Sequence, residues 1–186
     1  MLAIIIIDQV TKIWTASVSG EPVIWNESVG AHELYVVIEG YFRFVDYRNT
    51  GAAWGVFSDN TFILAIISMG AFVYFVWDFP NLTEGIGFRK FAWAILIGGV
   101  FGNFIDRFFY GAVIDMIQVN IPMPSFLHSY NWVRDGVYPF PAFNIADSGI
   151  CVGVILYFIH IIFFSKKNDA EASVQENDAE EGVETH

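Results

Sequence analysis

Charged residues and cysteine are both scarce in this 186-residue chain, and each shortage excludes a class of protein. Only 16% of the residues are charged, whereas soluble domains carry about 25%, and 55% are hydrophobic. The single cysteine, Cys151, excludes an internal disulfide and a cysteine-rich metal site. Lys and Arg number 9 against 20 acidic residues, with no basic patch, so we expect no nucleic-acid binding. The composition therefore favours a membrane protein over a soluble domain.

Sequence motifs of several common enzyme classes are also missing. The chain has no HExxH, no G-x-S-x-G, no P-loop and no GxGxxG. Its four histidines are scattered, at positions 32, 128, 160 and 186, so we expect no metal site and no cofactor. These absences leave carboxylates as the main candidates for chemistry.

Long uncharged runs stand where a soluble protein would have charges. Residues 60–77 and 148–165 each form a run of 18 residues without Asp, Glu, Lys or Arg, and residues 91–105 form one of 15. A membrane-spanning helix needs about 17–25 mostly apolar residues. The runs therefore predict transmembrane helices over about residues 60–77, 88–106 and 146–165.

A further helix is predicted over about residues 1–18, where an apolar start is interrupted by Asp8 and Lys12. These two charges are one helical turn apart, so they share one face. They are either a pair within the helix or part of a catalytic site. The expected fold is an all-α membrane protein of four transmembrane helices, with a small outward-facing region that contains strands.

The four predicted helices place both chain ends on the same side of the membrane. Counts of Lys and Arg give no clear orientation, and we favour cytoplasmic termini. The region 19–57 and a loop over 108–142 then face outward, and the alternating aromatics at 41–48 predict short strands. We divide the chain into a four-helix domain over 1–165 and an acidic, disordered cytoplasmic tail over 166–186.

Asp115 and Asp147 are the strongest candidates for chemistry, because neither has a Lys or Arg within four positions. Each is expected where a loop meets a helix, and two carboxylates at one membrane face can share a proton and activate water. Asp147 is equally a candidate for capping a helix. Glycine spacing predicts close packing of the last two helices, with Gly102 and Gly149 at the contact.

Several polar residues adjoin the apolar runs. Asn49, Asn103 and Asn144 are candidate hydrogen-bond donors to a backbone, or else turn and cap residues. Asp106 and Arg107 follow a predicted helix, where they are candidate anchors at the membrane interface. Arg107 is also a candidate ligand for a phosphate, a carbonyl or a substrate.

These residues, in this order, resemble the motifs of the lipoprotein signal peptidases (signal peptidase II). The matching segments are DQVTK at 8–12, NTGAAWG at 49–55, GGVFGNFIDR at 98–107, GAVID at 111–115 and FPAFNIADS at 140–148. Together they reach from residue 8 to the last predicted helix.

The resemblance implies an aspartic intramembrane endopeptidase of the bacterial inner membrane. Such enzymes cut the signal peptide from prolipoproteins just before a cysteine that carries diacylglycerol. Asp115 and Asp147 would be the catalytic pair. The residues implied to bind substrate or support the site are Asp8, Lys12, Asn49, Asn103, Arg107, Val113, Ala142 and Asn144. Cytoplasmic termini, an outward-facing site, contact with membrane lipid and inhibition by globomycin are implied as well.

The chain also departs from the family pattern. Its first helix has fewer residues before Asp8, and the acidic tail is extra. The segment 118–138 is longer than in many members, and its aromatic residues suggest a loop that rests on the outer membrane surface and gates access. Trp25, Tyr41, Phe42 and Trp54 are expected at the membrane interface.

Two other function classes remain alternatives at this stage. A small transporter would use membrane carboxylates as a proton relay and should show repeat symmetry, which the sequence lacks. A non-catalytic membrane scaffold would tolerate Asp→Asn changes. We expect a monomer.

Overall fold

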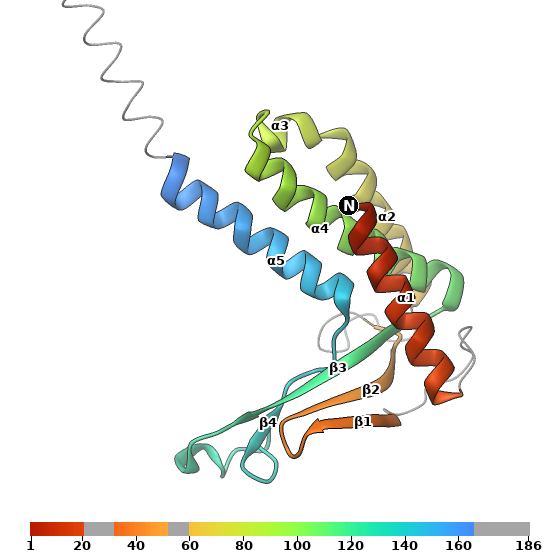
Figure 1. The fold of residues 1–186 in the computed structure, drawn as a ribbon, viewed down its shortest axis with the longest axis vertical. Helices are drawn as coiled ribbons and strands as arrows, with labels where there is room; N and C mark the ends of the chain where they lie inside the picture. Colours follow the sequence, from red (N-terminus) through yellow and green to blue (C-terminus); the bar gives the residue numbers. More distant parts are fainter. Residues whose placement is uncertain (21–31, 52–59, 166–186) are drawn as a thin grey trace, which may run out of the picture.

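The computed structural model of the protein describes residues 1–20, 32–51 and 60–165 (Figure 1). Helices occupy one part of the molecule, and a small antiparallel sheet lies across their ends (Figure 1). The predictions for Trp25, Trp54 and the tail over 166–186 lie outside the described residues.

The described part of the chain contains four long helices. They are α1 (Leu2–Ser19), α2 (Thr61–Trp77), α4 (Gly87–Ile105) and α5 (Ile145–His160). The short helix α3 (Phe79–Thr83) links α2 to α4. π-Helical turns extend α4 over Asp106–Tyr110 and α5 over Ile161–Ser165. Each long helix coincides with one of the apolar runs in the sequence, to within a few residues at its ends.

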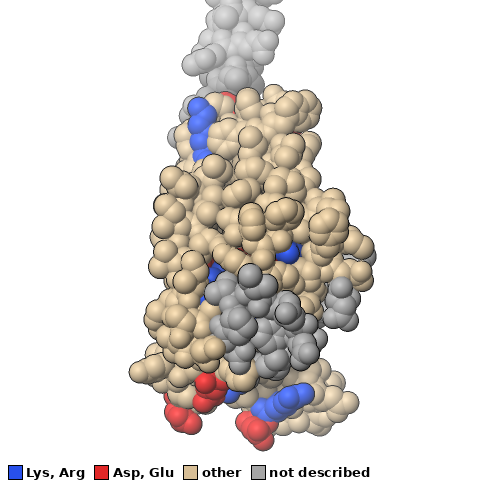
Figure 2. Space-filling view, turned by 90° about the vertical axis from the view of Figure 1, so that its right-hand side faces the viewer, with Lys and Arg blue, Asp and Glu red and all other residues tan. Residues whose placement is uncertain are grey.

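Three of these helices are long and apolar enough to cross a membrane. They are Leu2–Ser19, Gly87–Tyr110 and Ile145–Phe164, with mean hydropathies of 1.3, 1.3 and 2.0. Large apolar side chains such as Ile6, Ile155 and Phe163 are exposed on them, and few charges reach the surface of the helical part (Figure 2). The helix α2 is apolar but has only 17 residues, so the predicted fourth crossing is not confirmed.

Glycine allows α4 to lie close against α5 and α1. A Cβ on Gly102 would be 3.2 Å from Cβ of Ala146 in α5, and one on Gly149 would be 3.6 Å from the carbonyl oxygen of Ile95 in α4. A Cβ on Gly98 would be 2.9 Å from the carbonyl oxygen of Met1. The predicted positions of Gly102 and Gly149 at this helix contact are therefore confirmed.

The sheet has the strand order β1-β2-β3-β4, with antiparallel neighbours. Its strands are β1 (His32–Ile38), β2 (Phe42–Asn49), β3 (Val113–Pro122) and β4 (Val137–Pro139). The strands predicted around 41–48 are present as β2 and its hairpin partner β1. Because the sheet is a substantial part of the described fold, the structure does not confirm the all-α label.

The prediction of a loop over 108–142 is wrong, because β3 and β4 lie within it. The first residues of β3 are buried on both faces, so the apolar–polar alternation that reveals a strand is missing there. Its partner β2 lies more than 60 residues earlier in the chain. Asp115 consequently lies within β3, and not at the junction of a loop with a helix as expected.

The pairing of β2 with β3 brings two predicted site residues together. Asn49 lies opposite Val113, and Tyr47 lies opposite Asp115. Side chains of residues two apart in a strand point to the same face, so Asn49 and Asp115 are diagonal neighbours. Ala16 of α1 packs against the opposite face of β3.

Candidate active site

Asp115 is held in the first half of β3 by two amide side chains. Asn49 Nδ2 donates to its Oδ2 at 3.1 Å, and Asn144 Nδ2 donates to its Oδ1 at 2.8 Å. Only 2% of Asp115 is exposed. A buried carboxyl group needs such partners because it has lost its contacts with water. Asn49 therefore points at the candidate site, as predicted.

Burial raises the pKa of Asp115 to about 8, and the charge of Asp147 adds to the increase. The hydrogen bonds from Asn49 and Asn144 and the charge of Lys12 act in the opposite direction. Desolvation is the largest of these effects, because it removes the water that would stabilise the charged form. Near neutral pH, Asp115 therefore holds its proton most of the time.

Asp147 lies in the first turn of α5 and forms a capping box with Asn144. Its backbone N donates to Asn144 Oδ1 at 2.9 Å, and its Oδ2 accepts from Asn144 N at 3.2 Å. Its other oxygen accepts from Asn103 Nδ2 of α4 at 2.7 Å. The alternative capping role is therefore observed, but Asp147 also makes a contact across to α4 that capping does not require.

Asn144 is fully buried and contacts both aspartates. Its side chain donates to Asp115 and its backbone donates to Asp147. Its Nδ2 also lies 3.1 Å from Asn103 Oδ1 and 3.3 Å from the carbonyl oxygen of Ile114. One asparagine thus joins the two carboxyl groups into a single hydrogen-bond network.

Lys12 forms the centre of a buried ionic cluster next to this network. Its Nζ lies 2.8 Å from Asp8 Oδ2 and 2.9 Å from Asp106 Oδ2, and it donates to Asn103 Oδ1 at 3.1 Å. Only 1% of the Lys12 side chain is exposed. A buried ammonium group persists only when partners of this kind replace its water.

The same cluster holds the backbone beside each candidate aspartate. Asp8 Oδ1 accepts from the backbone N of Ala146 at 2.9 Å. Asp106 Oδ2 accepts from the backbone N of Ile114 at 3.1 Å. Ala146 and Ile114 each directly precede one of the two aspartates. The Asp8–Lys12 pair is therefore both a pair within a helix and a support for the site.

Two members of this cluster were not predicted as site residues. Asp106 was a candidate anchor at the membrane interface, but its side chain is fully buried and contacts the ionic cluster instead. Gln9 Nε2 donates to Asp106 Oδ1 at 2.9 Å and to Asp8 Oδ2 at 3.2 Å. A polar residue beside Asp8 and an acid at the end of an apolar run were visible in the sequence, but their contact was not.

The remaining predicted residues lie around the pair. Arg107 Nη1 and Nη2 are 3.4 and 3.5 Å from the carbonyl oxygens of Asn103 and Gly51, which is long for a hydrogen bond. Val113 is buried opposite Asn49, and Ala142 is half-buried. The roles of Arg107, Val113 and Ala142 in substrate binding stay predictions.

The side chains of this site are suited to acid–base chemistry. Among the residues that the structure describes, no three His, Cys, Asp or Glu side chains are grouped to hold a metal ion. The network instead contains one carboxyl group with a raised pKa, a second carboxylate nearby and several amide donors. Such a set can activate water and bind a carbonyl oxygen.

Comparison with known families shows to which family the chain belongs. The family model described as Signal peptidase (SPase) II matches residues 1–163. The chain belongs to the signal peptidase II family. Membership of this family makes it a peptidase, and the resemblance noted in the five sequence segments is confirmed.

The peptidase is similar to curated proteins over most of its length. It is 34% identical over 170 residues to the lipoprotein signal peptidase of Staphylococcus carnosus, an alignment that covers 90% of each chain. It is 34% identical over 173 residues to the lipoprotein signal peptidase of Bacillus subtilis, covering 92% of this chain and 97% of the relative.

Two solved structures share the fold of the peptidase. They are described as a bacterial membrane enzyme determined by the in meso method at 2.3 and 1.9 Å resolution. Each is 30% identical with a TM-score of 0.63, and they cover 87% and 88% of this chain and 84% and 90% of their own. With its three apolar helices, the peptidase is a multi-pass bacterial membrane protein.

Proposed function

We propose that this peptidase is an aspartic endopeptidase that removes signal peptides from prolipoproteins, cutting just before a cysteine that carries diacylglycerol. Asp115 and Asp147 are its catalytic pair. The observation that carries this proposal is the position of Asn144, which donates from its side chain to one carboxyl group and from its backbone to the other.

The different surroundings of the two aspartates divide the chemistry between them. Asp115, with its raised pKa, holds a proton and donates it to the scissile carbonyl oxygen. Asp147 takes a proton from the attacking water. The water oxygen bonds to the carbonyl carbon to give a gem-diol. Asp147 then returns its proton to the leaving nitrogen as the C–N bond breaks, and the diol returns a proton to Asp115.

The amides around the pair hold the two carboxyl groups in fixed positions relative to each other. Asn49 and Asn144 fix the Asp115 carboxyl group, and Asn103 fixes Asp147 while also meeting Lys12. In this proposal, Arg107 binds the peptide backbone of the substrate. Val113 and Ala142 line the pocket. Positioning of this kind supplies much of the rate increase in enzymes, because the reacting groups need not be ordered during the step.

The substrate lipid and the membrane orientation belong to the same proposal. We place both termini in the cytoplasm of the bacterial inner membrane, with α2 as a fourth crossing and the site near the outer face. Arg89 and Lys90 lie at the beginning of α4, the opposite end from Asp106. The exposed apolar helix surface suits the acyl chains, since each buried CH₂ contributes about 0.8 kcal/mol.

Cleavage of defined peptides by the purified full chain tests this function. The matched substrates are a prolipoprotein peptide with a diacylglyceryl cysteine and the same peptide with an unmodified cysteine, both in lipid vesicles. We expect cleavage of the modified peptide alone, at the bond before the cysteine, as shown by the product masses. Equal cleavage of both peptides, or cleavage at another bond, would contradict the proposed specificity.

A further inference from the structure

Most of the connection between β3 and β4 is uncharged and rich in exposed rings, and its only charged residues, Arg134 and Asp135, lie at its end next to β4. Residues 116–133 contain no Asp, Glu, Lys or Arg. Phe126, Tyr130 and Trp132, which we call the aromatic tip, are 75%, 53% and 45% exposed. Exposed loops of water-facing proteins are usually polar, and aromatic residues are enriched where protein meets the membrane surface.

The connection that carries these rings is folded. The backbone N of Met123 donates to the carbonyl oxygen of Gly136 at 2.9 Å, and the His128 ring is 2.8 Å from the carbonyl oxygen of Met123. Val133 is buried beneath the segment, with 9% exposed. The rings therefore project from a segment held by its own hydrogen bonds, and their exposure follows from the fold.

The sheet places this end beside the helices, where lipid surrounds them. Figure 1 shows β3 running crosswise to the helices, so that its far end extends to the side of α5. The strand begins three residues after the span Gly87–Tyr110 ends, and α5 begins six residues after β4 ends. The β3–β4 hairpin that carries the connection is thus joined to a candidate membrane span before β3 and after β4.

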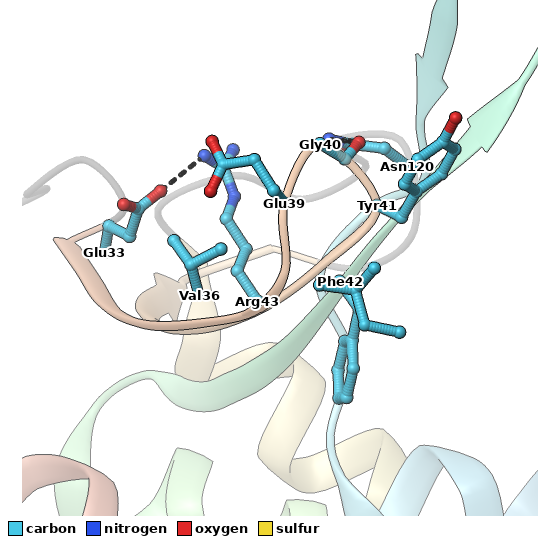
Figure 3. A pocket seen from close by; sticks show the side chains of 9 residues that line it. Glu33, Val36, Glu39, Gly40, Tyr41, Phe42, Arg43 and Asn120 are labelled. Atoms are coloured by element: carbon cyan, nitrogen blue, oxygen red, sulfur yellow. Dashed lines mark hydrogen bonds and ion pairs between the residues drawn. The ribbon is translucent and has the colours of Figure 1, made fainter.

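The neighbouring hairpin carries an exposed ion pair on one side, while its buried pair Asp46–Arg48 lies within the fold beside Ser19 of α1. Arg43 Nη1 pairs with Glu33 Oε2 at 2.8 Å, and Figure 3 shows both on the side of the hairpin opposite to Phe42. Phe42 contacts Phe44, which in turn contacts Trp14 of α1. The ring-bearing side of the hairpin therefore continues the exposed apolar surface of α1, and the charged side is turned away from it.

We propose that the aromatic tip docks on the lipid surface beside α4 and α5 and seats the sheet on the membrane. The aromatic tip contacts the headgroup and upper acyl region of the bilayer that surrounds the spans. This region accepts rings with a polar edge such as Tyr and Trp, and it disfavours buried charges, which are absent from the ring-bearing segment 116–133.

A ladder of rings links the aromatic tip to the candidate active site. Tyr130 stacks on Trp132 with centroids 5.7 Å apart, and Trp132 meets Tyr138 at 5.8 Å. The ladder continues through Phe140 to Phe143, with centroid distances of 6.5 and 6.0 Å. Phe143 directly precedes the asparagine that joins the two aspartates. Docking of the tip therefore sets the position of the candidate active site along the membrane normal.

Nitroxide labels in lipid nanodiscs test the docking without reference to catalysis. In a Cys151→Ser background, labels are placed by Phe126→Cys or Trp132→Cys, with Glu33→Cys as the matched control on the charged side. The native Cys151, which is exposed on α5, gives the reference for a lipid-facing label. The measurement compares relaxation by oxygen, which concentrates in lipid, with relaxation by a water-soluble nickel chelate.

We expect the labels at 126 and 132 to favour oxygen over nickel several-fold, as the label at 151 does, and the label at 33 to favour nickel. Equal nickel access at 126 and 33 would overturn the proposal. Dipolar broadening that disappears on dilution with unlabelled protein would also overturn it, because a second copy would then cover the tip. The double variant Phe126→Ser, Trp132→Ser should raise KM for a vesicle-bound substrate several-fold at unchanged kcat. Among these measurements, only this one rests on the proposed function.

Discussion

Asn144 is the residue whose loss should damage the site most without removing a carboxyl group. It is fully buried and has partners on β3, α4 and α5. We expect Asn144→Ala to abolish cleavage and to lower the free energy of unfolding by about 1–3 kcal/mol, because its partners lose their hydrogen bonds in a buried place. Asn120→Ala, which removes a half-buried amide farther along β3, should leave cleavage close to wild type. Detergent unfolding curves and peptide cleavage rates measure both effects.

The raised pKa of Asp115 predicts a characteristic dependence of stability on pH. The unfolded chain releases this proton near the ordinary value of about 3.9, and the folded protein releases it near about 8. The folded state therefore binds the extra proton between these values, and its contribution to stability is lost as the pH rises through about 8.

Asp115→Asn should flatten this dependence. We expect the melting temperature of the wild type to fall more steeply than that of the variant between about pH 4 and about pH 8 and to level off above, because over this range the unfolded wild type has lost the proton that the folded protein keeps. Cleavage by the wild type should decline as the pH rises through about 8, since the proposed mechanism needs a protonated Asp115. Parallel melting curves for the two proteins across this range would count against the assignment of the proton.

Lys12 should be essential for folding although it contacts neither candidate aspartate directly. Lys12→Met would leave Asp8 and Asp106 buried beside each other without a cation. We expect a loss of about 3–5 kcal/mol in the free energy of unfolding, the usual cost of breaking a buried ion pair from one side. Lys90→Met, at an exposed lysine of α4, is the matched control and should change stability little. Equal stability of the two variants would show that the buried cluster is dispensable.

At the scale of elements, the contact of α4 with α5 is set by glycine. A Cβ on Gly99 would collide with the carbonyl oxygen of Ala146, one residue before Asp147 in α5. We expect Gly99→Ala to separate the helices, lower the melting temperature and reduce cleavage. Gly70→Ala in α2, where no atom lies within 4 Å, should be neutral or gain up to about 1 kcal/mol from helix propensity. Similar melting temperatures for both variants would contradict this account of the packing.

The helices were predictable from sequence because their signal is local. An uncharged run of 15 to 18 residues has few structural alternatives in a chain with so little charge. The strand β3 was missed because its buried first half shows no alternation and its partner lies far away in the chain. The sheet therefore depended on long-range pairing, which no single segment reveals.

The candidate site was predictable in part for the same reason. Asp115 and Asp147 stood out as isolated carboxylates, and the resemblance pointed to their amide neighbours. Asp106 and Gln9 were missed because their role depends on a contact between α1 and the end of α4, about 97 positions apart. The buried environment of Lys12 was hidden for the same reason, because two of its three partners, Asn103 and Asp106, lie far away in the chain.

At the scale of the whole molecule, the helices and the sheet have separate tasks. The helices α4 and α5 anchor Asn103 and Asp147 at the membrane, and β2 and β3 bring Asn49 and Asp115 to the same place. Neither part contains a complete site. In the proposed function, a site at the junction of the helices and the sheet suits a substrate whose lipid lies in the bilayer and whose peptide extends out of it.

The central claim is that Asp115 and Asp147 act as one catalytic unit, and single and double variants test it most directly. The measurement is the rate at which the full chain cleaves a diacylglyceryl-modified prolipoprotein peptide when it carries Asp115→Asn, Asp147→Asn or both. Asp135→Asn is the matched control, at an exposed turn with a φ of 50° that Asn adopts readily. We predict losses on the order of 10³-fold or more for each single variant, no further loss for the double variant, and wild-type rates for the control. Near-normal cleavage by either single variant would contradict the account.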